Sequence, residues 1–159
     1  MQTKYVGIIE RSICAIKERA GATCHTITFK RYTSLMKKSP IEGVVDLLNR
    51  FPSKDGVSDN LSTSTIVEGI PKVDMGQNKL AFGSYALVQI GTTNTMQIRC
   101  VPAISLKVSN DSGGYYFMNI FTGKLMHSYN RKELSTTEEI IEQVDKLSGY
   151  ERRPIMGDV

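Results

Sequence analysis

A glutamate and a lysine seven positions apart, Glu10 and Lys17, are the first side chains whose types and spacing suit catalysis. The segment around them has the apolar spacing of a helix, and residues seven apart on a helix differ by only about 20° in direction. Both side chains therefore share one edge of the predicted helix. A glutamate can complete a site for two divalent metal ions, with a lysine holding a phosphate beside them. The alternative interpretation is a surface pair on an amphipathic helix.

Other metal or nucleophile sites have little support. The adjacent Cys24 and His25 suggest zinc, but the only other histidine is His127 and the sequence has no CxxC motif. Three cysteines without a repeated spacing fit a reducing compartment. Since the sequence shows no signal pattern and no apolar run of about 18 residues, we expect an intracellular protein, nuclear or cytoplasmic, with no membrane partner.

Charge is distributed unevenly along the 159 residues. Residues 1–54 hold ten Lys and Arg against four Asp and Glu, a balance of +6, whereas residues 55–159 have a balance of −2. The basic N-terminal part is therefore the part expected to meet a polyanion. A solvated basic surface with no such partner is the alternative.

The elements that must position these residues begin with two helices and a short third one. We predict a helix over residues 4–20 that stops at Gly21, and a second over 41–51 with Pro40 in its first turn. Ser62 and Gly69 have the residue types of the cap and stop of a short helix. The predicted buried face of the first helix consists of Ile9, Ile13, Ile16 and Ala20.

After residue 80 the pattern changes to short strands. We predict strands over 84–90 and 97–106, the second bent at Pro102, and a hairpin of 115–120 with 124–129 around Gly123. Four or five short strands in about 50 residues suggest a small barrel or a curled sheet. A capping box from Thr136 to Glu139 then predicts a helix that ends at Gly149.

Several of these motifs occur in an order that suggests a family. They are residues 8–19 around Glu10, 25–31, the LNxxP helix end in 46–52, and then 55–58, 62–69, 82–85, 113–117, 122–124 and 140–144. Together they resemble the C-terminal part of the integrase of copia-type retrotransposons, over about residues 5–158.

The resemblance implies an α+β fold in which the C-terminal helices of a ribonuclease-H-like integrase core precede a small β-barrel and a C-terminal helix. It implies a helical remnant of the catalytic core over 1–70, a linker over 71–79, the barrel over 80–134, the helix over 135–150 and a tail over 151–159.

Integrases of this family join element DNA to target DNA, using two aspartates and a glutamate that hold Mg²⁺ or Mn²⁺. By similarity Glu10 takes the place of the glutamate, as catalytic and metal-binding residue, and the aspartates would lie upstream of Met1. We therefore expect a fragment of a retrotransposon integrase that is catalytically incomplete and binds no metal by itself. Cys14 stands where some integrases carry a DNA-contacting lysine.

DNA is the expected partner, and the side chains expected to contact it are Arg11, Lys17, Arg19, Lys30 and Arg31. We also expect self-association, because exposed apolar helical faces would promote it. The alternative to an integrase fragment is a domesticated, non-enzymatic module that binds nucleic acid or protein and in which Glu10 has no metal role.

Overall fold

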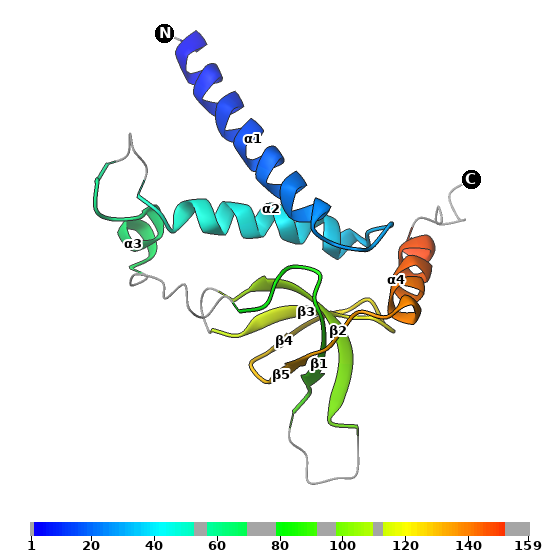
Figure 1. Cartoon of the computed structure of the whole chain (residues 1–159). Helices are drawn as coiled ribbons and strands as arrows, with labels where there is room; N and C mark the ends of the chain where they lie inside the picture. The colour runs from blue at the N-terminus through cyan, green and yellow to red at the C-terminus, as the bar shows by residue number, and fades with distance from the viewer. Residues whose placement is uncertain (1, 53–56, 70–78, 92–97, 110–112, 152–159) are drawn as a thin grey trace, which may run out of the picture.

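The computed structural model describes residues 2–52, 57–69, 79–91, 98–109 and 113–151 (Figure 1). Within these ranges the chain is α+β, with four helices and one antiparallel sheet of five strands. The predicted loop 53–56, residues 71–78 of the predicted linker and 152–159 of the predicted tail lie outside them. The elements are α1 (Gln2–His25), α2 (Ser34–Asn49), α3 (Thr63–Glu68), β1 (Tyr85–Gln89), β2 (Cys100–Val108), β3 (Tyr115–Asn119), β4 (Leu125–Ser128), β5 (Arg131–Glu133) and α4 (Glu138–Glu151).

The sheet has the order β4-β3-β2-β1-β5, so the last strand returns to pair with the first. The other edge approaches β1 as well, because the Ser128 hydroxyl at the end of β4 donates to the Gln89 carbonyl at 3.1 Å. The sheet is therefore curled (Figure 1). Closure into a barrel and a ribonuclease-H-like helical part stay predictions.

The two faces of the sheet carry two apolar clusters. The buried members of the cluster on the helix side are Phe29, Met36, Ile104, Leu106, Met118, Ile120 and Val144. Those on the opposite side are Ala86, Val88, Ala103, Tyr115 and Phe117. Because successive strand residues point to opposite faces, Tyr116 points away from its buried neighbours Tyr115 and Phe117.

The first helix was predicted to stop at Gly21, and this is wrong, because α1 continues to His25. Glycine costs a helix interior only about 1 kcal/mol relative to alanine. A contact from outside the helix holds its last turn, since the Tyr32 hydroxyl donates to the Cys24 carbonyl at 3.1 Å. That contact is not visible in the local pattern.

The predicted bounds of the second helix are also wrong. Helix α2 begins at Ser34, and Pro40 lies inside it rather than in its first turn. The start is fixed by Thr33, whose side chain caps the helix and accepts from the Met36 N–H at 3.4 Å. Thr33 and Met36 are both fully buried, so tertiary packing anchors the turn before the proline.

The C-terminal helix begins two residues after the predicted cap Thr136 and runs beyond the predicted stop at Gly149. Its last residue, Glu151, accepts a hydrogen bond from the Ser34 N–H at 2.6 Å. The carboxylate therefore caps α2 and joins the two helices.

Predictions with strong local signals are confirmed in the sheet and in α3. Ser62 caps α3, and Gly69 ends it in the left-handed conformation. Gly123 adopts the same left-handed conformation in the turn of the β3–β4 hairpin. Strand β2 is continuous through Pro102, and its ladder with β3 shifts register between Ser105 and Lys107. The short strand β5 was not predicted.

The predicted buried face of α1 is covered only in part. Ala20 is buried and Ile16 is half-buried, but Ile9 and Ile13 are 59% and 45% exposed. Figure 1 shows the cause, since the N-terminal half of α1 projects away from the rest of the molecule. The prediction that Ile9 and Ile13 are buried is therefore wrong for this chain.

Candidate nucleic-acid interface

Glu10 lies on the projecting half of α1, and its side chain is exposed. Lys17 is exposed too, two turns further along the same edge. Within the described ranges, no group of three or more His, Cys, Asp or Glu side chains is placed to hold a metal ion. The catalytic and metal-binding role of Glu10 stays a prediction.

The five side chains predicted to contact DNA are all exposed, but they do not form one surface. Arg11 and Arg19 line the same groove. Lys17 points to another side of α1, about 160° from Arg19 at 100° per residue. Lys30 and Arg31 lie in the connection between α1 and α2. The structure therefore brings together two of the five.

The groove that Arg11 and Arg19 share runs between α1, α2 and the start of α3, with a volume of about 830 Å³. The two arginines stand eight residues apart, which is about 12 Å along the helix axis. Its apolar lining consists of Ala15, Ile16, Val45, Leu48, Phe51 and Pro52, and its polar lining adds Ser12, Asn49 and Thr63.

Neither arginine of this groove forms an ion pair with a carboxylate of the described residues. The ion pairs in that part of the chain join Lys107 to Glu42 and to Asp46. A guanidinium presents a planar fork of donors that matches the oxygens of a phosphate. Phe51, at one end of the groove, is 49% exposed and offers an apolar ring. The groove thus combines two free cations with a surface on which a base can stack.

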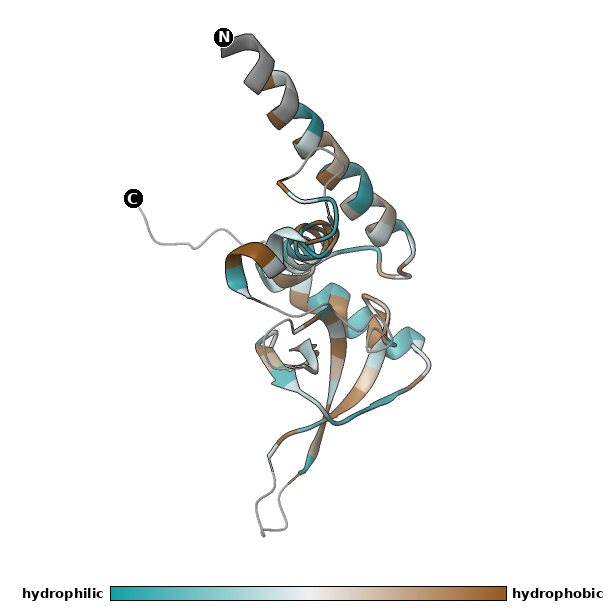
Figure 2. Ribbon diagram, turned by 90° about the vertical axis from the view of Figure 1, so that its left-hand side faces the viewer, coloured by the Kyte–Doolittle hydropathy of each residue, from teal (hydrophilic) through white to brown (hydrophobic). Residues whose placement is uncertain are grey.

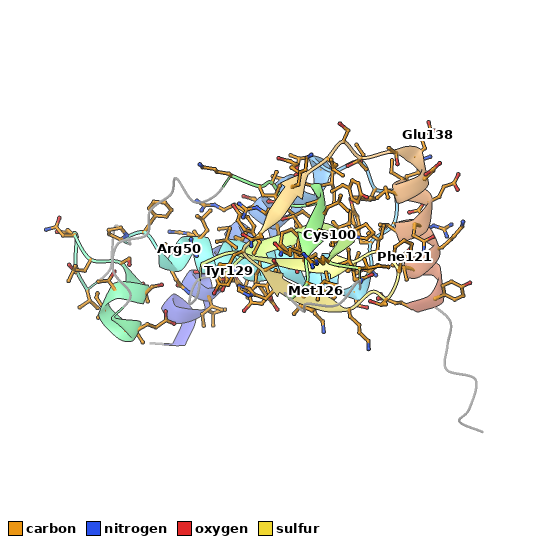
Figure 3. All side chains as sticks on the ribbon, turned by 90° about the horizontal axis from the view of Figure 1, so that it is seen from below. Arg50, Cys100, Phe121, Met126, Tyr129 and Glu138 are labelled. Carbon is orange, nitrogen blue, oxygen red and sulfur yellow. The ribbon has the colours of Figure 1, made fainter. Side chains whose placement is uncertain are left out.

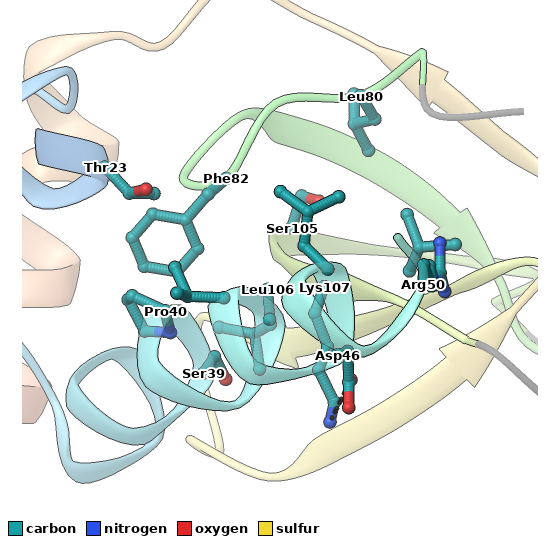
Figure 4. A pocket seen from close by; sticks show the side chains of 14 residues that line it. Thr23, Ser39, Pro40, Asp46, Arg50, Leu80, Phe82, Ser105, Leu106 and Lys107 are labelled. Carbon is teal, nitrogen blue, oxygen red and sulfur yellow. Dashed lines mark hydrogen bonds and ion pairs between the residues drawn. The ribbon is translucent and has the colours of Figure 1, made fainter. Parts of the chain in front are cut away.

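A second cavity, of about 290 Å³, lies between α2 and β2 (Figure 4). Two cations, Lys107 and Arg50, line this cavity, and Lys107 is already neutralised by Glu42 at 3.0 Å and Asp46 at 3.4 Å. Burial lowers the pKa of Lys107, but the hydrogen bond that Lys107 donates to Glu42 and the charges of both carboxylates outweigh burial and raise the pKa above its ordinary value. Lys107 is therefore a poor ligand for a phosphate. No sequence pattern indicated this cluster, because Lys107 lies 61 positions from Asp46.

A row of aromatic rings lies on the sheet, formed by Tyr116, His127 and Tyr129. The ring of His127 is 5.2 Å from that of Tyr116 and 5.1 Å from that of Tyr129, measured between centroids. Tyr129 is 58% exposed and is labelled in Figure 3. Sequence reasoning missed this row, because it depends on the pairing of Tyr116 with His127 across β3 and β4.

The three cysteines are free, with Cys14 and Cys100 exposed and Cys24 half-buried. Burial raises the pKa of the Cys24 thiol, so the thiolate that zinc prefers is disfavoured there. His25 is exposed, and His127 belongs to the aromatic row on the sheet. In the described ranges, no helix has the length and apolar character needed to cross a membrane.

Comparisons of the chain with protein-family models, with curated proteins and with solved structures returned no match. The functional proposal therefore rests on the groove between α1 and α2 and on the charge of the N-terminal residues.

Proposed function

We propose that this chain binds nucleic acid, as the C-terminal part of a retrotransposon integrase of the copia type, and does not join DNA strands by itself. The observation that carries the proposal is a pair of arginines, Arg11 and Arg19, that share one open groove and form no ion pair with any carboxylate in the described part of the chain. The balance of +6 over residues 1–54 supports it, because a basic segment attracts a phosphate backbone at long range.

The fold supports the same proposal in two places. A long helix that carries Glu10 and is followed by α2 fits the end of a ribonuclease-H-like core. The return of β5 to pair with β1 fits a small barrel over residues 80–134. Both assignments belong to the proposal.

Binding in the groove would be electrostatic and largely independent of base sequence. Each arginine neutralises a phosphate and releases its counterion, so affinity falls as salt rises. Phe51 adds a ring on which a base of a single strand can stack. A groove with both features binds single strands at least as well as duplexes.

In this proposal Glu10 supplies one carboxylate to a two-metal site. Two-metal catalysis needs further oxygen ligands, since Mg²⁺ prefers octahedral coordination and is weakly held by one carboxylate. We therefore expect the purified chain to show no Mg²⁺- or Mn²⁺-dependent joining of DNA ends. Measurable joining would overturn this part of the proposal.

The binding itself is tested with fluorescently labelled duplex and single-stranded DNA, by anisotropy over a range of salt. We expect binding at low salt, and we expect Arg11→Glu with Arg19→Glu to weaken it more than tenfold. Loss of two phosphate contacts should reduce the slope of log affinity against log salt by about 1.8.

The matched control reverses two exposed lysines of the sheet region, Lys124→Glu with Lys132→Glu, which changes net charge by the same amount. If both double variants weaken binding equally, the effect comes from net charge and the groove is not the site. If the unaltered chain binds no DNA at low salt, the proposal fails.

A second candidate function, a binding module without a metal role, is favoured by the aromatic row on the sheet. His127→Ala with Tyr129→Ala removes the exposed part of that row. If this variant abolishes binding to single strands and the arginine variant does not, the sheet is the nucleic-acid surface and the module is the better description.

A further inference from the structure

A hollow of about 250 Å³ lies between the first half of α2 and strands β2, β3 and β4. Figure 2, in which α2 is seen nearly end-on, shows this helix above the sheet, with apolar strand segments in brown beneath it. We call this hollow the Ser39 pocket. Its lining consists of Leu35, Lys38, Ser39 and Glu42 from α2, with Lys107, Tyr116 and Leu125 from the strands.

Ser39 is the residue that points to a ligand. It is only 5% exposed, yet its hydroxyl forms no hydrogen bond in the part of the chain that the structure describes. Buried hydroxyls without a partner are costly, and native proteins hold few of them. A hydroxyl inside a helix can donate to the carbonyl one turn earlier, as Thr23 does to Arg19 at 3.0 Å. Ser39 makes no such bond, so its hydroxyl is available to a group that enters the pocket.

The charges of the lining favour an anion. Lys38 and Lys107 stand against Glu42 alone, a balance of +1. Lys107 is engaged by Glu42 at 3.0 Å and by Asp46, which lines the neighbouring cavity of about 290 Å³. Lys38 forms no ion pair within the described residues. The Lys38 ammonium is therefore the charge that an anion in this pocket would meet.

The remaining lining suits a flat apolar group. Leu35 and Leu125 are aliphatic, and Tyr116 contributes an aromatic ring. That ring is held in place, because the His127 ring lies 5.2 Å from it and the Lys107 ammonium lies 5.9 Å from its centroid. A volume of about 250 Å³ admits a ligand on the order of ten non-hydrogen atoms.

We propose that the Ser39 pocket binds a small aromatic carboxylic acid. One ammonium and one hydroxyl, from Lys38 and Ser39, match the two oxygens of a carboxylate. The aromatic ring of the acid packs against Tyr116 and the two leucines. A phosphate would leave oxygens without donors there, because the lining includes no arginine and Lys107 is already engaged.

The first test is a titration of the full chain with phenylacetate, followed in the amide NMR spectrum. We expect a Kd on the order of 0.1–1 mM for a ligand of this size, with the shifts centred on α2 and Tyr116. Phenylacetamide has the same shape without the charge and should bind at least about tenfold more weakly. Inorganic phosphate should not compete.

Three results would overturn the proposal. One is a spectrum that phenylacetate leaves unchanged well above the expected Kd, as would happen if water alone occupies the pocket. Another is equal binding of phenylacetamide or effective competition by phosphate, since either excludes recognition of a carboxylate. The third is a set of shifts centred on another cavity.

The second test removes the two polar groups one at a time. Ser39→Ala deletes only the hydroxyl and suits a helix, so the chain should stay folded while phenylacetate binds at least about fivefold more weakly. Lys38→Met should weaken binding at least about threefold. Lys37→Met is the matched control, because Lys37 is exposed on the same helix but lies outside the lining. Unchanged affinity in Ser39→Ala, or equal losses in the two methionine variants, contradicts the proposal.

The Ser39 pocket and the proposed nucleic-acid groove can fail separately. They share no lining residue, and phenylacetate binding is measured without DNA. The variant Arg11→Glu with Arg19→Glu, which tests the groove, should still bind phenylacetate. If that variant abolishes phenylacetate binding, the carboxylate lies in the groove and the assignment to the Ser39 pocket is wrong.

Discussion

Gly83 is a position where adding one methyl group should be costly. Its φ of +81° lies in the left-handed region, and a Cβ there would stand 2.3 Å from Cγ2 and 3.2 Å from Cβ of Ile27. Ile27 belongs to the connection between α1 and α2, whereas the Gly83 N–H donates to the Ser105 carbonyl in β2 at 2.9 Å. Gly83→Ala therefore forces apart the place where this connection meets the sheet.

The magnitude follows from two contributions. A left-handed conformation costs a non-glycine residue about 1–2 kcal/mol. Displacing Ile27 by enough to clear the new methyl group resembles an overpacked core, which costs about 1–3 kcal/mol. We therefore expect Gly83→Ala to lower the free energy of unfolding by about 2–5 kcal/mol, a large part of the stability of a small domain.

Urea unfolding followed by circular dichroism measures this change. Gly123→Ala is the matched control, because Gly123 has a φ of +67° but no atom within 4 Å of its Cβ position, and it should cost only about 1 kcal/mol. Ile27→Ala removes Cγ2, so in the double variant with Gly83→Ala about 1–2 kcal/mol should be recovered relative to additivity.

Two results would refute this reasoning about Gly83. One is a cost for Gly83→Ala no larger than that for Gly123→Ala, which would mean that Ile27 moves without penalty. The other is strict additivity with Ile27→Ala, which would mean that the two side chains do not meet.

Three further predictions concern stability. Lys107→Met should lower the free energy of unfolding by about 0.5–1 kcal/mol at neutral pH. The pKa of Lys107 is raised in the folded state above its ordinary 10.5, so its contribution to stability is complete below that pH and is lost as pH rises further. Alkaline unfolding should therefore depend less on pH in the variant. Glu151→Ala should lower the free energy of unfolding by about 1 kcal/mol in urea, because the Ser34 N–H loses its cap, and an unchanged midpoint would contradict this. Met118→Ala, at a fully buried position, should cost about 2–5 kcal/mol by thermal unfolding.

The sequence predicted the elements whose ends are decided by local chemistry. Ser62 and Gly69 bound α3 because a hydroxyl cap and a left-handed glycine act within a few residues. Gly123 identified the β3–β4 hairpin for the same reason.

The predictions that failed are those that tertiary contacts decide. Gly21 and Pro40 read as helix boundaries, but Tyr32 holds the end of α1 and the buried Thr33 and Met36 hold the start of α2. The strand β5 escaped prediction because Arg131–Glu133 is a charged triplet, which becomes a strand by pairing with β1.

The candidate site was predictable only in composition. The sequence identified basic residues near Glu10, and helix geometry alone separates Lys17 from Arg19. The grouping of Arg11 with Arg19 in one groove depends on where α2 lies against α1. The lining of the groove also includes Phe51 and Pro52, and the spacing of residues in α1 does not predict that they lie there. The prediction that Ile9 and Ile13 are buried failed because periodicity identifies an apolar face without showing whether another element covers it.

The pairing of β5 with β1 has a consequence for how the chain matures during translation. Until residue 133 has left the ribosome, the open edge of β1 has no neighbour on that side, so an incomplete chain offers a template for intermolecular strand addition. Closing the sheet also brings together segments about 45 residues apart, which raises contact order and slows the step. Nascent chains arrested before Arg131 should therefore aggregate or recruit chaperones more than chains arrested just after Glu133.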